Sequence, residues 1–270
     1  MKFLQWALPH LDLSWQGFRK VRGQVCKRIQ RRLQELSLKD LIAYRQRLQR
    51  DPDEWHKLDG CCHITISRFY RDRGVFDALQ ERILPEIALQ ASRAHRAARA
   101  LSVGCASGEE VYTLRILWDL KLACRVPGTT LSIIATDIDD KVLRRAHGAC
   151  YPSGCLRELA PCLREQAFTF VRGQYCVRPQ HRNNIEILKQ DVRTEMPQGP
   201  FDLVLCRNLA FTYFTPELQK IVLDRILRGL APHGYLVIGS HEHLPLHTEA
   251  LVAKPRELAI FQLAEERNAP

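Results

Sequence analysis

The sequence predicts an α/β fold with a mostly parallel sheet, preceded by a small all-helical domain. From about residue 100 onward, short apolar runs alternate with amphipathic helical patterns. Such alternation is typical of a parallel sheet covered by helices on both faces. The first strand–helix unit is LSVGCASGEEVYT at 101–113, where a glycine turn separates an apolar strand from a helical pattern. This unit opens Rossmann-like, nucleotide-binding sheets.

Periodicity divides the chain into regions. Val25, Ile29 and Leu33 recur every four residues, which indicates a buried helix face near the start of the chain. A later helical pattern is kinked or restarted at Pro85. The expected regions are a helical N-terminal domain at 1–75, a linking helix at 76–99 and the α/β domain at 100–270, with a small subdomain near 151–184.

The α/β domain contains the expected strands in a regular order. They are 100–103, 131–136, 185–188, 201–206, 235–239 and 258–263, with a strand pair inside 168–177. Ligands of parallel sheets bind beyond the carboxyl ends of the strands. Gly104, Asp137, Asp191 and Arg207 all fall at such ends.

Composition narrows the class of protein. The net charge is +10, with much of the excess before residue 100, which indicates an acidic partner or a solvated basic helix face. No secretory signal is evident, so we expect a cytoplasmic protein with its ten cysteines reduced. Cys150, Cys155 and Cys162 lack zinc-site spacing, and we expect no metal. No apolar run reaches membrane-spanning length.

The glycine turn also predicts a kind of cofactor. Gly104 and Gly108 let the backbone approach a ligand, and the helix that follows offers unpaired N–H groups. Glu109 and Glu110 stand where a phosphate would bind. Two carboxylates repel a pyrophosphate but attract an ammonium group, which favours a phosphate-free cationic nucleotide such as S-adenosylmethionine.

Polar residues after the next strands have two interpretations each. Asp137 could bind both ribose hydroxyls or cap a helix, although Asp139 is better placed as a cap. Asp191 could accept a hydrogen bond from an adenine amino group or be a loop aspartate. Arg207 and Asn208, which follow FDLVLC, could line a cleft or be structural.

A cationic segment precedes the α/β domain. In ITISRFYRDRGVF at 64–76, Arg71 and Arg73 flank Asp72 after two aromatic residues. The segment could be a surface salt-bridge cluster. Alternatively, Arg71 is held by the aromatic residues and binds a carboxylate. The sequence contains no P-loop, no Ser-His-Asp signature and no His-Glu-x-x-His.

Taken together, these segments resemble the CheR-type methyltransferases, the protein-glutamate O-methyltransferases of bacterial chemotaxis. The segments that carry the resemblance are SRFYRD at 67–72, GCASGEEVYT at 104–113, ATDIDDKVLRRAHGACY at 135–151, QDV at 190–192, FDLVLCRNLAFTYF at 201–214 and LVIGSHE at 236–242. They occur in the family's order. The resemblance implies a class I methyltransferase core that uses S-adenosylmethionine.

The resemblance also implies roles for individual residues. Thr65, Ser67 and Arg71 would lie near both the cofactor and the reacting carboxylate. Glu109 (or Glu110) would bind the methionine ammonium, Asp137 the ribose, and Asp191 and Val192 the adenine. Arg207 and Asn208 would line the cofactor cleft, and Tyr213 would face the substrate. Arg71 and Tyr213 are the implied catalytic residues.

The chain departs from the family pattern at several positions. Ser67 replaces a threonine, Asp191-Val192 replaces Asn-Leu, and the stretch between Asn208 and Tyr213 is one residue longer. The order Ser-His-Glu at 240–242 replaces His-Ser-Glu. Segment 168–178 lacks the glycine-rich hairpin loop of receptor-tethered members, so we expect no tether to a receptor pentapeptide.

The expected function is carboxyl O-methylation of glutamate side chains in a signalling or chemotaxis protein. Two alternatives stay open: the same catalyst acting on a small molecule or an unrelated protein, and a non-catalytic module that senses the cofactor. The expected partner is an acidic protein or a small carboxylate, with no nucleic acid and no membrane insertion.

Overall fold

The computed structural model describes residues 2–245, 250–253 and 259–264. The chain forms two compact units: Met1–Ile64 with Thr212–Gln219, called here the helical unit, and Thr65–Phe211 with Lys220–Pro270, called the core unit. The core unit thus begins at Thr65, before the expected domain boundary near 75.

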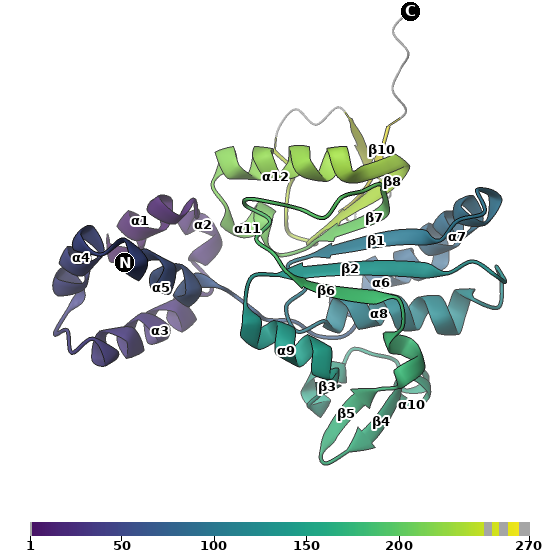
Figure 1. Ribbon diagram of the computed structural model, residues 1–270, viewed down its shortest axis with the longest axis horizontal. Helices are drawn as coiled ribbons and strands as arrows, with labels where there is room; N and C mark the ends of the chain where they lie inside the picture. The colour runs from purple at the N-terminus through teal and green to yellow at the C-terminus, as the bar shows by residue number, and fades with distance from the viewer. Residues whose placement is uncertain (1, 246–249, 254–258, 265–270) are drawn as a thin grey trace, which may run out of the picture. The chain divides into compact units, whose positions relative to one another are not determined.

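The helical unit is built from short helices (Figure 1). They are α1 (Lys2–Ala7), α2 (Trp15–Phe18), α3 (Arg22–Glu35), α4 (Leu41–Arg50) and α5 (Pro52–Cys62). Local sequence explains where two of them begin. The Asp40 carboxylate accepts the N–H groups of Ile42 and Ala43, and the Asp51 carboxylate accepts that of Asp53 behind Pro52.

One carboxylate is buried in this unit. Glu54 is only 3% exposed, and it accepts hydrogen bonds from Arg32 (Nε–Oε1 2.9 Å, Nη2–Oε2 2.7 Å) and from the Tyr44 hydroxyl (2.9 Å). The Arg32 guanidinium lowers the pKa of the Glu54 carboxyl below its ordinary value. The ion pair therefore joins α3 to α5 in charged form.

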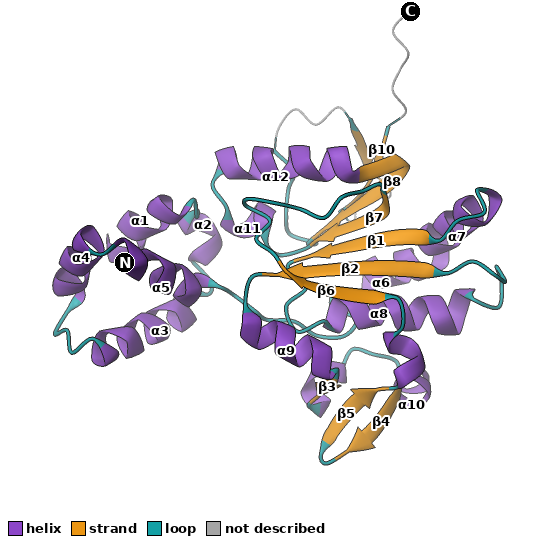
Figure 2. Ribbon diagram, viewed as in Figure 1, coloured by secondary structure: helices purple, strands orange, loops and turns teal. Residues whose placement is uncertain are grey.

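A mostly parallel seven-stranded sheet forms the centre of the core unit, which confirms the expected fold class (Figure 2). The strand order is β6-β2-β1-β7-β8-β10-β9. The strands are β1 (Ala98–Val103), β2 (Leu131–Asp137), β6 (Ile185–Lys189), β7 (Phe201–Cys206), β8 (Leu230–Ile238), β9 (Leu251–Ala253) and β10 (Ile260–Leu263). β6, β2, β1, β7 and β8 pair in parallel, whereas β10 is antiparallel to β8. Residue 258, where the last strand was expected to begin, lies outside the described residues.

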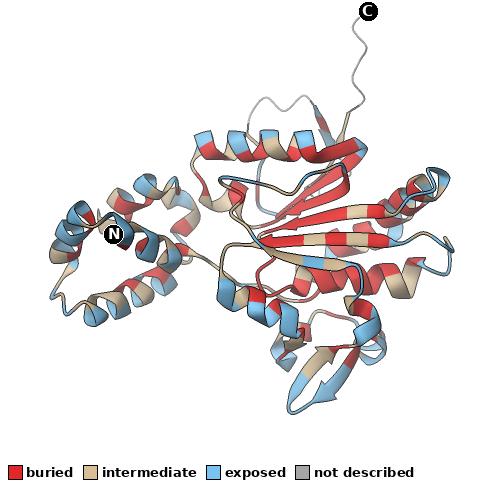
Figure 3. Cartoon of the chain, viewed as in Figure 1, coloured by how far each residue is buried: buried red, intermediate tan, exposed pale blue. Residues whose placement is uncertain are grey.

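The central strands β1 and β7 are buried on both faces of the sheet (Figure 3). Leu203 and Leu205 belong to the large hydrophobic cluster, and Val204 and Cys206, which alternate with them along the strand, are also fully buried. A strand covered on both faces is apolar at most positions, which explains the run FDLVLC. Its one polar residue, Asp202, is buried in an ion pair with Arg96 (2.6 Å). The other helices are α6 (Arg73–Ala78), α7 (Leu84–Arg93), α8 (Glu109–Leu117), α9 (Asp140–Gly148), α10 (Pro161–Ala167), α11 (Ala210–Tyr213) and α12 (Pro216–Gly229).

The region expected as a linking helix is part of the core. A π-helical turn at Leu79–Ile83 joins α6 to α7 just before Pro85, whose missing N–H it accommodates. α6 and α7 bury Phe76, Leu84 and Ile87 in the large hydrophobic cluster. The helix ends at Arg93 because His95 adopts a left-handed conformation (φ 49°), and β1 then begins at Ala98, inside the expected range 76–99.

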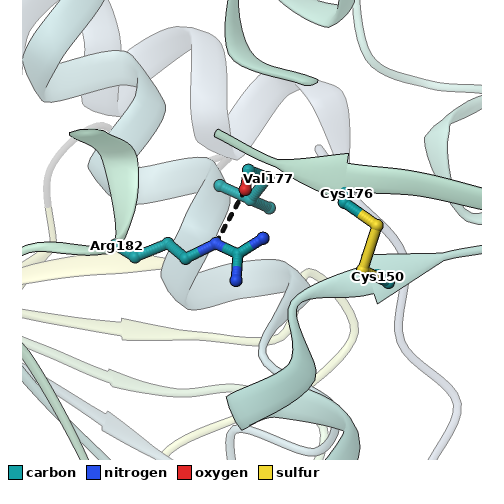
Figure 4. Close-up of a disulfide and its surroundings, with 4 residues drawn as sticks. All are labelled: Cys150, Cys176, Val177 and Arg182. Carbon is teal, nitrogen blue, oxygen red and sulfur yellow. Dashed lines mark hydrogen bonds between the residues drawn. A yellow bond between two sulfur atoms is a disulfide. The ribbon is translucent and has the colours of Figure 1, made fainter. Parts of the chain in front are cut away.

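A small sheet follows α9. Its order is β3 (Cys150–Tyr151), β5 (Gln174–Val177) and β4 (Phe168–Val171). Cys150 and Cys176 are directly opposite in the antiparallel pair and form a disulfide (Figure 4). The expectation that all cysteines are reduced is therefore wrong for this pair, because strand pairing joins residues that lie 26 positions apart.

No helix within 2–245 or the two short described segments is long and apolar enough to cross a membrane. In the same residues no group of three or more His, Cys, Asp or Glu side chains is placed to hold a metal ion.

We expect Glu54→Gln to destabilise the helical unit by about 2–4 kcal/mol, because it removes the buried charged partner of the Arg32 guanidinium. Trp6, Trp15 and Trp55 are three of the four tryptophans and lie in this unit. Urea unfolding followed by tryptophan fluorescence therefore measures the effect.

The lowered pKa of Glu54 also sets a pH dependence. Its stabilisation is complete above the unfolded glutamate pKa of about 4.3 and is lost as the pH falls through the folded value. Wild type should lose this stability in acid, and Glu54→Gln should lose less. Glu35, which also pairs with Arg32 but is half exposed, provides the control Glu35→Gln, for which we expect a change within about 0.5 kcal/mol. Equal effects of the two variants would contradict a special role for the buried pair.

Candidate cofactor and active site

The candidate site lies at the edge where the parallel strands end. β6, β2, β1 and β7 run in the same direction, so their carboxyl ends meet at one edge of the sheet. The segments that leave these ends carry Gly104, Asp137, Asp191 and Arg207. The tertiary structure therefore brings the four strand-end positions to the same edge.

The turn after β1 requires glycine. Gly104 has φ +71°, and a Cβ atom there would come within 2.5 Å of the Leu209 Cδ2 atom. Gly108, with φ +86°, is the residue at which α8 starts. Ala106 between them is also left-handed, with φ 49°. A side chain at position 104 would thus strain the backbone and push Leu209 out of the loop.

The Asp137 carboxylate shapes this turn. Its Oδ2 atom accepts the N–H of Ala106 (2.9 Å), and its Oδ1 atom accepts the N–H of Asp139 (3.0 Å). Asp139 itself is the N-cap of α9, through the N–H of Lys141 (2.7 Å). Asp137 therefore joins the loop after β1 to the end of β2, a contact that the sequence did not predict.

The adjacent acids Glu109 and Glu110 have different surroundings. Both carboxylate oxygens of Glu110 have partners: Oε1 accepts the Ser102 hydroxyl (2.8 Å), and Oε2 pairs with Arg207 (2.8 Å). Glu109 is 1% exposed; its Oε1 atom accepts the Ser107 hydroxyl (3.1 Å) and lies 3.6 Å from Arg145. Its Oε2 atom is buried with no hydrogen-bond partner among the described residues. Of the two acids, Glu109 is the one that keeps an open acceptor.

Tyr151 supports the same turn from the small sheet. Its hydroxyl donates to the carbonyl oxygen of Ser107 (2.7 Å), and its ring lies edge-on to that of Phe69. Burial raises the pKa of the Tyr151 phenol well above its ordinary value, so the hydroxyl stays protonated and donates. An isolated tyrosine in the sequence carried no signal of this contact.

After β6, Asp191 binds its own loop. Its Oδ1 atom accepts the N–H of Arg193 (2.9 Å), and the Arg193 guanidinium pairs with both carboxylate oxygens. Val192 is buried, and its carbonyl oxygen accepts Arg225 (2.9 Å). The Oε1 atom of Gln190, which sequence reasoning did not single out, is buried without a hydrogen-bond partner in the described chain.

Charged side chains with little exposure hold the end of β7 in place. The Arg207 side chain is 3% exposed and binds Glu110 and Asp72 (Nη2–Oδ2 2.7 Å). Asn208 has φ 55°, and its N–H donates to Glu242 (2.8 Å), which also accepts the N–H of Gly239 (2.6 Å). Glu242 therefore joins the ends of β7 and β8. Burial of these charges depends on packing, so the sequence alone did not reveal it.

The segment before α6 lies beside this cluster. The Arg71 guanidinium is partly exposed and donates to the carbonyl oxygen of Ile66 (2.7 Å). Phe69 and Tyr70 are buried in the core, so they anchor the segment rather than the Arg71 side chain. Asp72 pairs with Arg207, and the alternative that it forms a salt bridge with Arg71 does not hold in this structure.

The remaining predicted residues have fewer contacts. Thr65 and Ser67 are partly exposed. Tyr213 belongs to the helical unit, where its ring packs on Phe18 (4.9 Å between centroids) and its carbonyl oxygen accepts the N–H of Ser14 (2.7 Å). Its assignment to the active site stays a prediction.

The donor and acceptor groups at this edge indicate the kind of ligand that fits. Glu109 Oε2 and Gln190 Oε1 are buried acceptors without donors in the described residues. Such groups are costly unless a ligand supplies hydrogen-bond donors. An ammonium, an amino group and ribose hydroxyls are donors of this kind. The fold and the site together define a Rossmann-like protein that binds a nucleoside cofactor with a cationic amino-acid end.

Comparison with known families identifies the group. Residues 65–257 match the family described as "CheR methyltransferase, SAM binding domain". This match covers more than half of the chain, so the protein belongs to the CheR family of S-adenosylmethionine-dependent methyltransferases.

Individual relatives agree with this family. The chain is 33% identical to an uncharacterized 104.1 kDa protein of Rhodobacter capsulatus over 82% of this chain and 23% of that protein. It is 33% identical to the chemotaxis protein methyltransferase of Listeria monocytogenes over 67% of this chain and 66% of that protein. It is 28% identical to chemotaxis protein methyltransferase 1 of Pseudomonas aeruginosa over 86% of each. The chain thus spans about a quarter of the first relative's length and about two thirds of the second's.

We expect Asp137→Ala to weaken binding of S-adenosylhomocysteine by roughly 1–3 kcal/mol, or about 5- to 150-fold, because the carboxylate holds the glycine turn through the N–H of Ala106. Calorimetric titration measures the affinity. Asp139→Ala removes only the helix cap and is the matched control, expected to keep the affinity within about twofold while costing about 1 kcal/mol of stability. Wild-type affinity in Asp137→Ala would remove Asp137 from the site.

Proposed function

We propose that this protein transfers a methyl group from S-adenosylmethionine to the carboxylate of glutamate side chains in a signalling protein. The observation that carries this proposal is Arg71, a partly exposed guanidinium on a segment anchored beside the candidate cofactor site. The names of the Listeria and Pseudomonas relatives place those proteins in chemotaxis, which supports a protein substrate of this class.

The cofactor would be held by the loops at the edge of the sheet. Glu109 would accept the methionine ammonium through its open Oε2 atom, and Asp137 would accept the ribose hydroxyls beside the bonds it makes to the turn. The segment 190–192 would face the adenine, with Gln190 as a further acceptor because Arg193 occupies Asp191. Once bound, the sulfonium supplies an activated methyl group.

The remaining task of the protein is to position the acceptor. A glutamate carboxylate has a pKa of about 4.3 and is already ionised near neutral pH, so its methylation needs no general base. The guanidinium of Arg71 can bind a carboxylate through two parallel hydrogen bonds. Binding of this kind would orient one oxygen toward the methyl group and supply the rate acceleration through orientation.

Charge and the small sheet bear on the partner. α3 is rich in arginine, with Arg22, Arg28, Arg31 and Arg32, which supports an acidic protein partner. The β4–β5 hairpin is closed by Arg172 and Gly173, both with positive φ, as in a two-residue turn. So short a turn supports the proposal that the protein does not dock a receptor pentapeptide there.

The reaction type is tested with methyl-labelled cofactor. Cell lysate is incubated with the enzyme and the labelled cofactor, and the labelled products are then treated with mild base. We expect label on protein that base releases as methanol, because carboxyl methyl esters hydrolyse readily. Base-stable label would assign a different acceptor atom, label only on small molecules would assign a small substrate, and no label above a heat-inactivated control would indicate a cofactor-sensing module.

We expect Arg71→Lys to lower the turnover by on the order of tenfold or more, because lysine keeps the charge but cannot form the planar fork. Arg71→Ala should be slower still. Cofactor affinity should stay within about threefold in both variants. Single-turnover methyl transfer, with cofactor titration in parallel, measures the two effects separately.

Arg73→Ala is the matched control for this position. Arg73 begins α6, is exposed and lies two residues away, so its removal should change turnover by less than about twofold. Full activity of Arg71→Lys would show that Arg71 is only a surface charge, and glutamate recognition would then lose its main physical support.

A further inference from the structure

The backbone on both sides of Arg71 is held in an unfavourable conformation. Tyr70 has φ 58° and Asp72 has φ 61°, both in the left-handed region. Residues other than glycine adopt this region at a cost of about 1–2 kcal/mol each, so surrounding contacts must hold them there. The pair of left-handed residues turns the chain sharply before and after Arg71, which fixes where this residue leaves the core.

The residue before Arg71 is held by the core. The Tyr70 N–H donates to the Thr113 hydroxyl (3.2 Å), and the Tyr70 hydroxyl donates to Asp77 (2.8 Å). Tyr70 is 6% exposed, and its ring packs against Phe76 (5.3 Å between centroids). These contacts fix one flank without any charged group from the sheet.

The other flank is held in part by its own helix, since the Asp72 carbonyl oxygen accepts the N–H of Val75 (2.8 Å), and in part by Arg207. The Arg207 Nη2 atom donates both to Asp72 Oδ2 (2.7 Å) and to the backbone carbonyl oxygen of Arg71 (2.9 Å). Its Nη1 atom donates to Glu110 (2.8 Å), which Ser102 holds in turn, and the guanidinium lies over the Phe76 ring (5.1 Å). The fork therefore spans the segment 71–72, the first turn of α8 and the end of β7.

We infer that Arg207 is a positioning residue for Arg71. Its side chain is 3% exposed, and its two Nη atoms bind the protein itself. It acts by holding Asp72 and the Arg71 carbonyl oxygen, so that the Arg71 guanidinium enters the site at a fixed place. The inference rests on the proposed function, in which Arg71 binds the acceptor carboxylate.

The geometry makes lysine the informative substitution. An ammonium group at position 207 keeps the positive charge between Glu110 and Asp72, which avoids leaving two partly buried carboxylates unpaired. A single nitrogen on a flexible stem cannot reproduce the fork that binds Glu110, Asp72 and the Arg71 carbonyl oxygen together. Arg207→Lys should therefore release the segment around Arg71 while the core unit stays folded.

The first measurement is single-turnover methyl transfer combined with a double-mutant cycle. We expect Arg207→Lys to lower the rate about tenfold, with affinity for S-adenosylhomocysteine within about threefold. In an Arg71→Ala background the same change should cost less than about twofold, because a residue that acts through Arg71 has nothing left to position. Independent, additive losses would overturn the inference, since they would show that Arg207 acts elsewhere.

The second measurement does not depend on the reaction. Hydrogen exchange of peptides covering 65–72 should be about tenfold faster in Arg207→Lys, with unchanged exchange in β2 and β6. Unchanged exchange at 65–72 would overturn the inference even if no methyl acceptor were found. If wild type transfers no methyl group, the proposed function fails, and exchange alone then decides whether Arg207 holds this segment.

Arg115→Lys is the matched control. Arg115 is a similarly buried arginine of α8 that pairs with Asp119 (2.7 Å) and donates to the carbonyl oxygen of Leu131 (2.8 Å) at the start of β2. It should cost stability, but the rate should stay within about twofold and exchange at 65–72 should be unchanged. If Arg115→Lys slowed methyl transfer as much as Arg207→Lys does, the rate loss would reflect general destabilisation, and the inference would be overturned.

Discussion

Carboxylates that bind the protein's own backbone and arginines hold the site edge of the sheet in shape. Asp137 accepts N–H groups from the turn after β1 and from the start of α9, and Glu242 accepts those of Asn208 and Gly239. Glu110 binds Arg207. Each contact joins segments that leave different strands. Because charged hydrogen bonds in buried surroundings are short and directional, they can hold left-handed residues such as Ala106 and Asn208 in place.

The same edge separates structural charges from those left for a ligand. Glu109 and Glu110 are adjacent in sequence and on one helix turn, yet one keeps an open buried acceptor and the other is fully paired. The two arginines differ in the same way: Arg71 is partly exposed, whereas the Arg207 side chain is buried in its ion pairs. A guanidinium is thus partly exposed at this edge, while the buried Arg207 keeps its charged partners.

The small sheet supports the site edge of the large sheet through Tyr151. Tyr151 follows the disulfide-bonded Cys150, donates to the Ser107 carbonyl oxygen of the glycine turn and packs against Phe69 of the segment that carries Arg71. One buried aromatic residue thus contacts both segments that bound the site. The covalent link between β3 and β5 holds the strand on which this tyrosine lies (Figure 4).

The sequence by itself determined the α/β order, the mostly parallel sheet, the glycine turn and the strand-end positions of Gly104, Asp137 and Arg207, because periodicity and turn chemistry are local properties. Tertiary structure alone decided which charges pair. Arg207 and Asp72 lie 135 positions apart, and Cys150 and Cys176 meet only across paired strands. Whether a charged side chain faces a ligand or a partner in the protein depends on packing from distant segments, and no local pattern records it.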